Sequence, residues 1–112
     1  MPTAEGTSQA PAQRARRRLP ESALAGLRQA FAAEVSERLP RLRTAAATHD
    51  ADALRAALRD VHTLGSSAYV VGEREAAETA RAAEAVLVEQ GPLEEFSRLV
   101  RDLDANLRDW QA

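Results

Sequence analysis

The fold of this 112-residue chain is decided by one stretch, Asp60-Val61-His62-Thr63-Leu64-Gly65-Ser66-Ser67-Ala68-Tyr69-Val70-Val71-Gly72. On a helix of about 3.6 residues per turn, the apolar residues in and just before it share one stripe: Leu54, Ala57, Val61, Leu64, Ala68 and Val71. His62 lies about 100° around the helix from Val61. Its flank also carries Arg55, Arg59, Ser66 and Tyr69. The stretch therefore predicts a helix with one buried face and a histidine at the rim of the core.

Small residues follow the histidine by one helical turn. A glycine inside a helix costs up to about 1 kcal/mol relative to alanine, and serine adds a further penalty. Access to the imidazole ring is one reason to place Gly65 and Ser66 here. A close helix crossing would explain Gly65 equally well, although it explains Ser66 less well.

The residues before this stretch predict a first helix that starts at Pro20, whose missing N–H costs nothing in a first turn. Its apolar residues recur every three or four positions: Leu24, Leu27, Phe31, Val35 and Leu39. Pro40 interrupts the series, which resumes at Leu42, so we expect a kink or short break near residues 37–40.

Helix ends and two further helices follow from the remaining pattern. Asp50 is expected to cap the His62 helix, which should span about 51–70 and end at Gly72. A helix over about 73–89 should bury Ala76, Ala77, Ala80, Ala83 and Leu87. After Gly91-Pro92, a last helix should bury Leu93, Phe96, Leu99, Val100, Leu103, Leu107 and Trp110.

The connections are short, so neighbouring helices should run antiparallel. We predict an all-α fold, an antiparallel up-down-up-down four-helix bundle with a short extra N-terminal helical segment, over residues 19–112. A composition of 45% hydrophobic but only 4% aromatic residues agrees with a core of alanine and leucine. Residues 1–18 are rich in polar residues and arginine and show no apolar period, so they are expected to form a disordered basic tail.

Composition also excludes several functions. The chain has no cysteine, and its two histidines, His49 and His62, have no third ligand at metal-binding spacing, so no bound metal is expected. Four arginines and one glutamate in residues 1–18 leave a net charge of −5 on residues 19–112, which disfavours nucleic-acid binding. With neither a long apolar run nor a signal peptide, we expect a cytoplasmic protein that does not enter a membrane.

The pattern around the histidine resembles a known family. His62-Thr63-Leu64, the small residues 65–68 and Gly72, ten positions after the histidine, are similar to the signature of the histidine-containing phosphotransfer (HPt) family. The resemblance covers about residues 20–110. It implies a phosphorelay intermediate that accepts a phosphoryl group on His62 and exchanges it with the aspartate of a response-regulator receiver domain.

The same resemblance implies the partners and cofactors. A receiver domain, a sensor histidine kinase or both would bind this chain, and Mg²⁺ would belong to the receiver, so that this chain needs no cofactor of its own. The protein would act as a monomeric carrier and not as a kinase, since it has no glycine-rich phosphate loop and no nucleotide-binding motif.

The chain departs from the family at two positions. The family usually has lysine three positions after the histidine and glycine at the fourth, where this chain has Gly65 and Ser66. Arg55 and Arg59 could supply positive charge on the same flank. We expect Arg59, Ser66 and Gly65 to support the phosphoryl group. The residues expected to dock a partner are Arg55, Leu58, Thr63, Tyr69 and Val70.

Alternatives from other classes stay open. Tyr69 could equally be an aromatic residue at the edge of the core, and His49 is expected to be polar surface that stays unphosphorylated. The chain could be a non-phosphorylated HPt-like helical adaptor that binds receiver or kinase domains. It could also be a fragment of a larger sensor kinase, with residues 1–18 as part of a linker, although the initiating methionine favours a free-standing protein.

Overall fold

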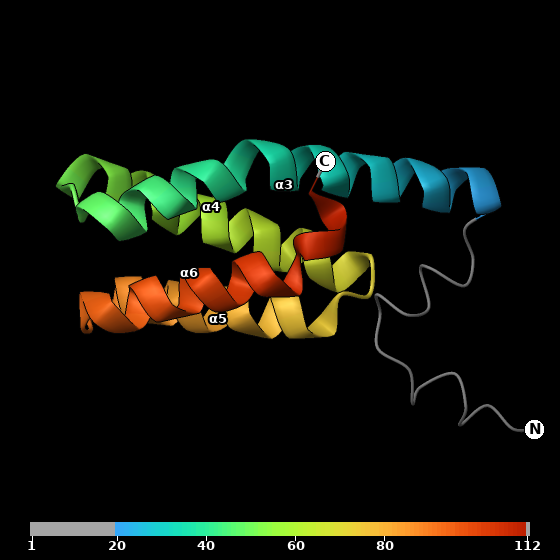
Figure 1. Ribbon diagram of the computed structural model, residues 1–112. Helices are drawn as coiled ribbons and strands as arrows, with labels where there is room; N and C mark the ends of the chain where they lie inside the picture. The colour runs from blue at the N-terminus through green and yellow to red at the C-terminus, as the bar shows by residue number, and fades with distance from the viewer. Residues whose placement is uncertain (1–19, 112) are drawn as a thin grey trace, which may run out of the picture.

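The computed structural model describes residues 20–111 and arranges them as four helices. They are α3 (Glu21–Thr48), α4 (Ala51–Val70), α5 (Arg74–Val88) and α6 (Leu93–Asn106), followed by the short 3₁₀ helix η1 (Arg108–Trp110). Successive helices run in opposite directions, and α4 packs against both α3 and α5 (Figure 1). The predicted all-α four-helix bundle is confirmed. The tail predicted over residues 1–18 lies outside the described residues.

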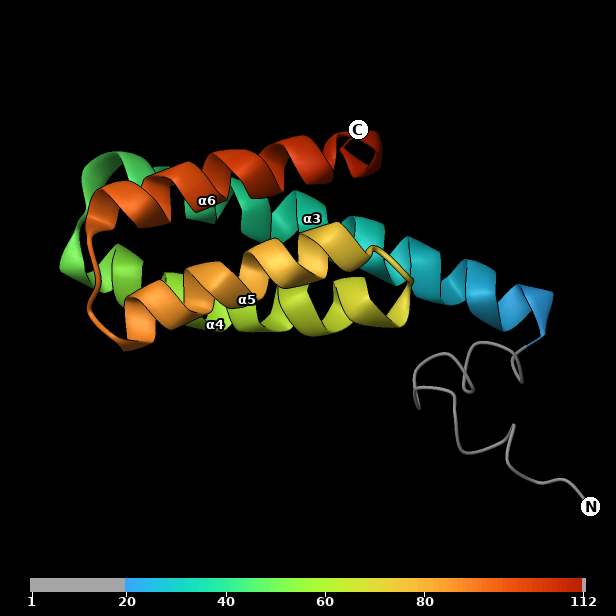
Figure 2. The same ribbon diagram turned by 90° about the horizontal axis from the view of Figure 1, so that it is seen from below.

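The first helix differs from the prediction. α3 continues without a break through Pro40, so of the two alternatives expected near residues 37–40, a kink or a short break, the short break is wrong. Pro40 is exposed, whereas Leu39 and Leu42 are fully buried, so packing on the bundle outweighs the helix penalty of about 3 kcal/mol for one interior proline. The N-terminal turns of α3 project past the end of α4 (Figure 2). The expected extra N-terminal segment is therefore continuous with α3.

The ends of α4 follow the predicted capping residues. The side chain of Asp50 accepts a hydrogen bond from the backbone N–H of Ala53 at 3.0 Å, and Gly72 adopts a left-handed φ of 86° just after the helix. At the end of α5 the left-handed residue is Gln90, with φ 54°, and Gly91 only donates its N–H back to the helix. The connection between α5 and α6 therefore falls at Gly91-Pro92 as predicted, although Gln90 and not the glycine adopts the left-handed conformation.

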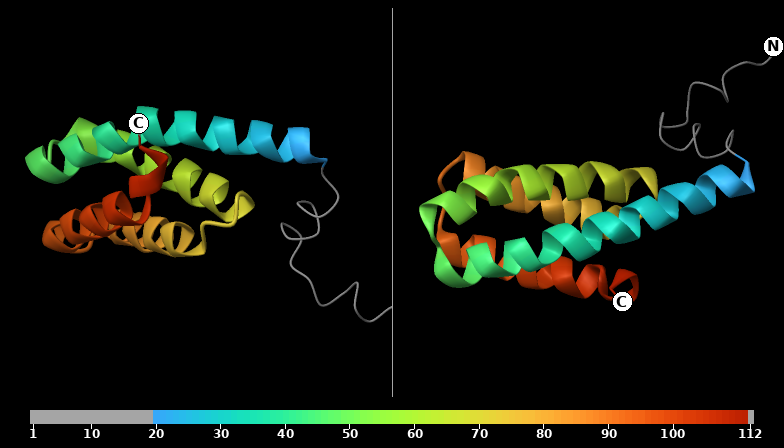
Figure 3. Two further views of the ribbon diagram at one scale, coloured as in Figure 1. Left: turned by 45° about the vertical axis from the view of Figure 1, so that its right-hand side comes forward. Right: turned by 90° about the horizontal axis from the view of Figure 1, so that it is seen from above.

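The core lies between all four helices. Its fully buried large side chains are Phe31, Val35, Leu39, Leu42, Val61, Leu64, Phe96, Leu103 and Leu107. The C-terminal turn folds back on α3 (Figure 3). There the rings of Trp110 and Phe31 pack edge to face, with their centroids 4.7 Å apart. None of the described helices combines the length and hydropathy that a membrane span requires.

Small residues let α4 and α5 approach closely. Gly65 is buried in this contact, and a Cβ atom placed on it would lie 3.3 Å from the Cβ of Ala80. Alanines form the facing side of α5. The helix-crossing explanation for Gly65 is therefore confirmed, while Ser66 lies on the exposed side of α4. The close approach determines which α5 side chains can reach the histidine.

Candidate functional site

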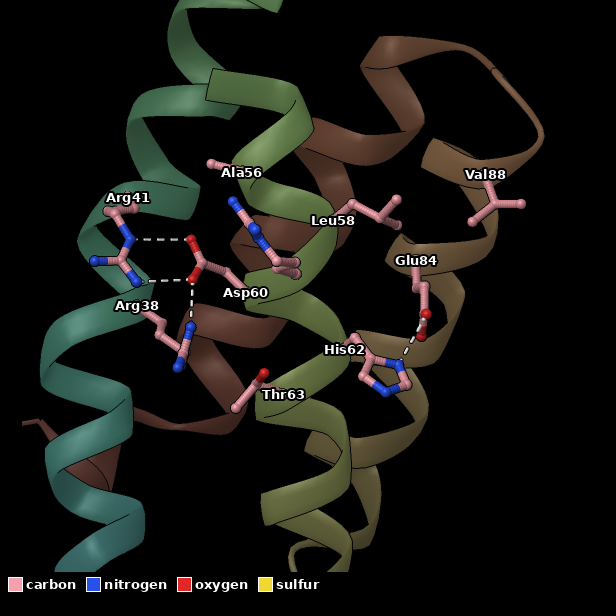
Figure 4. A pocket seen from close by; sticks show the side chains of 10 residues that line it. Arg38, Arg41, Ala56, Leu58, Asp60, His62, Thr63, Glu84 and Val88 are labelled. Carbon is pink, nitrogen blue, oxygen red and sulfur yellow. Dashed lines mark hydrogen bonds and ion pairs between the residues drawn. The ribbon is translucent and has the colours of Figure 1, made fainter. Parts of the chain in front are cut away.

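His62 stands on the surface of α4 beside α5. Its side chain is 66% exposed, and its Nδ1 atom lies 3.0 Å from Oε2 of Glu84, which is 30% exposed (Figure 4). Glu84 comes from the third turn of α5, so the contact depends on the close packing of the two helices.

This contact distinguishes the two ring nitrogens. A carboxylate accepts hydrogen bonds and does not donate them, so Nδ1 of His62 carries the proton when the ring is neutral. Nε2 then carries the lone pair, and in Figure 4 this nitrogen points away from Glu84. The geometry therefore offers one exposed nucleophilic nitrogen whose partner nitrogen is oriented by a carboxylate.

A second charged cluster lies on the other side of α4. Asp60 is 3% exposed at its side chain, and its Oδ1 accepts hydrogen bonds from Arg38 at 2.7 Å and from Arg41 at 2.8 Å. Nε of Arg41 also donates to Oδ2 of Asp60 at 3.1 Å, which makes this pair bidentate. Burial alone raises the pKa of Asp60, but hydrogen bonds and charges from Arg41 and Arg38 outweigh it and leave the pKa lowered.

One surface depression contains both clusters. It is lined from α3, α4 and α5 and includes the Asp60 cluster, His62, Glu84 and the apolar side chains of Leu58 and Val88. Val88 is 62% exposed. A partner that reached His62 would therefore meet both charged and apolar groups around it.

The depression gathers four of the residues singled out from the sequence: Leu58, Arg59, His62 and Thr63. Arg59 is exposed and forms no ion pair with another residue in the range 20–111. Ser66 is also exposed, one turn further along α4. A cation and a hydroxyl are therefore available on the helix that carries the histidine.

The other sequence candidates lie elsewhere. Gly65 is buried against α5, and Arg55 pairs with Asp52 at 3.0 Å on an exposed turn near the start of α4. Val70 is 37% exposed and lines a separate depression against α3. Tyr69 is half-buried at the edge of the core. The structure therefore does not place these four residues in the depression around His62.

Sequence reasoning missed the partners on neighbouring helices. Asp60 falls at the buried register of α4, one turn from Ala57 and Leu64, which could have marked it as a carboxylate needing buried cations. The contact of Glu84 with His62 has no signal in the local sequence, because the two residues lie on different helices. Across residues 20–111, no group of three or more potential metal ligands is close enough to hold an ion.

His49 has a different setting from His62. It follows α3 with a left-handed φ of 55°, and its Nε2 lies 3.2 Å from Oγ of Ser97. That hydroxyl donates to the carbonyl oxygen of Ala46 at 3.0 Å, so the ring nitrogen is the donor to the serine. His49 is therefore a polar residue of a turn, with its Nε2 already engaged.

The fold and the site define a class: a four-helix bundle that presents one oriented, solvent-exposed histidine from the middle of its second helix. Comparison with protein families agrees, since the family model described as Hpt domain matches residues 26–112. The chain belongs to the Hpt domain family, whose members act in histidine phosphotransfer within phosphorelays. Neither a curated protein nor a solved structure matches the chain.

Proposed function

We propose that this chain is a histidine phosphotransfer protein that accepts a phosphoryl group on His62 and exchanges it with the aspartate of a response-regulator receiver domain. The observation that carries the proposal is the exposed imidazole whose Nδ1 is held by Glu84. Hpt domains interact with receiver domains and kinases, so a receiver, a sensor histidine kinase or both would be the partners. A receiver partner would place the reaction in the cytoplasm.

The transfer step needs one nucleophile and good positioning. The Nε2 lone pair of His62 attacks the phosphorus of the aspartyl phosphate, the P–O bond to the aspartate breaks, and the aspartate leaves as a carboxylate. The imidazole ring becomes positively charged while Nδ1 keeps its proton, and Glu84 stabilises that charge. In reverse, the receiver carboxylate attacks phosphorus and the N–P bond breaks. Mg²⁺ would belong to the receiver.

Arg59 and Ser66 are proposed to contact the phosphoryl group. It carries about two negative charges, which the guanidinium of Arg59 can partly offset from one turn away on the same helix. The exposed hydroxyl of Ser66 can donate a hydrogen bond to a phosphoryl oxygen. Alanine at either position should slow transfer; unchanged rates would remove that residue from the mechanism. Gly65 would act indirectly, by letting α5 bring Glu84 within reach of His62.

Docking is proposed at the depression around the histidine. Leu58 and the exposed Val88 provide apolar contact area, and Thr63 lies with them beside His62. Arg55, Tyr69 and Val70 could enlarge this surface at its margins. We propose that the chain binds its partner as a monomer.

The test is transfer of label from a panel of phosphorylated receiver domains of the same organism to this chain. His49→Ala is the matched control, because His49 is the second exposed histidine of the chain. Acid-labile label on the wild type and on His49→Ala, but not on His62→Ala, is the expected result. If receivers bind but none transfers label, the proposal fails and the protein is a helical adaptor.

A further inference from the structure

Arg81 lies on α5 beside the candidate site and has no assigned role. Its guanidinium carbon sits 5.5 Å from the centre of the Tyr69 ring, in a cation–π contact across the two helices. The side chain passes over Gly65, since its Cγ lies 4.0 Å from the position that a glycine Cβ would occupy. Arg81 is exposed and forms no ion pair within residues 20–111.

Arg81 lies one helical turn from the residue that contacts His62. It stands three residues before Glu84 on the same helix, and side chains at this spacing have Cβ atoms about 5–6 Å apart. The carboxylate of Glu84 is itself bonded to the imidazole. A long arginine side chain can therefore turn from the Tyr69 ring toward a group on His62 by changing side-chain torsions alone.

The charge on this flank changes when His62 is phosphorylated. A phosphoryl group adds about two negative charges. A phosphoryl group on Nε2 would stand on the side of the ring that points away from Glu84 (Figure 4), and Arg81 is a cation one turn from Glu84 on α5. A cation–π contact at an exposed position is weaker than a charge-assisted hydrogen bond to a phosphoryl oxygen. Phosphorylation would therefore draw the guanidinium away from Tyr69.

We propose that Arg81 stabilises phosphorylated His62. Its guanidinium lies on the Tyr69 ring in the free protein and moves to the phosphoryl group after phosphorylation. This inference rests on the proposed function. Gly65 contributes by leaving room for the arginine stem between the helices, where a larger side chain would stand in its path. A purely structural Arg81 would stay on Tyr69 whatever the state of His62.

The experiment uses phosphoramidate, a small phosphoryl donor that needs no partner protein, on the ¹⁵N-labelled full chain. Proton–nitrogen NMR spectra before and after phosphorylation report on Nε of Arg81. The ring current of Tyr69 shifts this signal in the free protein, and the shift should be lost on phosphorylation. Tyr69→Leu should remove the shift in the unphosphorylated protein, which assigns it to the ring.

A ³¹P titration supplies the second measurement. A neighbouring cation lowers the pKa of the phosphoryl group, so Arg81→Gln should raise its titration midpoint by about half a pH unit, with Arg81→Lys in between. Arg74→Gln is the matched control, since Arg74 is exposed on the same face of α5 two turns further away, and it should leave the midpoint unchanged.

An Arg81 signal that does not move, together with equal midpoints for wild type and Arg81→Gln, would overturn the inference while leaving the proposed function intact. Failure of every receiver to transfer label would remove the proposed function, but the phosphoramidate result would still decide the role of Arg81. If phosphoramidate leaves His62 unmodified, a receiver that transfers label supplies the phosphoryl group instead, and the same two measurements decide the role of Arg81.

Discussion

Asp60 and His62 are two residues apart on α4, yet their side chains lie in opposite settings. Asp60 faces α3, where its carboxylate is 3% exposed and bonded to Arg38 and Arg41. His62 faces α5, where its ring is 66% exposed and bonded to Glu84. The contacts are of similar length, between 2.7 and 3.1 Å.

The difference in burial separates the structural role of Asp60 from the chemical role that we propose for His62. A buried carboxylate needs its cations, and losing them leaves a desolvated charge. An exposed pair contributes little to stability, because water solvates either partner when the other is removed. The α3 side of α4 therefore holds two helices together, whereas the α5 side orients a ring that stays open to a partner. Four predictions test this contrast.

The largest effect on stability is expected from Asp60→Ala. Losing the carboxylate removes three hydrogen bonds, but Arg41 is 49% exposed and can regain water. We therefore expect a loss of about 2–3 kcal/mol, below the 3–5 kcal/mol typical of a fully buried pair broken on one side. Urea unfolding measures the loss, with Asp52→Ala as the control, because Asp52 is 86% exposed and, within residues 20–111, its side chain bonds only to Arg55. Equal losses in the two variants would contradict the buried role of Asp60.

Acid should remove part of the same stabilisation. The arginines lower the pKa of Asp60 below its unfolded value near 3.8, so the ionised cluster stabilises the fold fully above that pH. This contribution is lost as the pH falls through the lowered pKa of the folded state. The free energy of unfolding measured between about pH 5 and pH 2 should therefore fall more steeply for the wild type than for Asp60→Ala. Parallel curves would refute this.

Glu84→Gln should change chemistry and leave stability almost unaltered. Glutamine can still contact Nδ1 of His62 but carries no negative charge to stabilise the charged ring. We expect transfer to slow about tenfold, equivalent to about 1.4 kcal/mol in the barrier. Transfer reactions quenched at successive times measure the rate, and thermal melts measure the stability. Glu78→Gln is an exposed control on the same helix. A large drop in melting temperature with normal transfer would reverse the roles assigned to the two sides.

The smallest effect is expected from Arg43→Ala. Arg43 pairs with Asp104 at 3.0 Å between α3 and α6, with exposed fractions of 44% and 38%. Arg43 also donates to Oε1 of Gln111 at 2.6 Å. Because these contacts are exposed, we expect the free energy of unfolding to fall by about 0.5–1 kcal/mol and the transfer rate not to change. A loss as large as that of Asp60→Ala would show that burial does not decide the difference.

Local sequence signals were sufficient for most of the fold. The stripe around Val61 and Leu64, the cap at Asp50 and the glycine at position 72 act within a few residues, and α4 spans the predicted 51–70. The short break predicted as one alternative near Pro40 does not occur, because packing along the whole of α3 outweighs the local penalty of the proline.

What the sequence by itself determined is the bundle and the exposed position of His62, because helical periodicity alone decides which residues share a face. Only the tertiary structure decided which atoms meet that histidine. Glu84 reaches it because Gly65 and the alanines of α5 let two helices pack closely. Asp60 can be buried because two arginines of α3 face it. These contacts join residues about 20 positions apart, a distance over which periodicity carries no information about pairing.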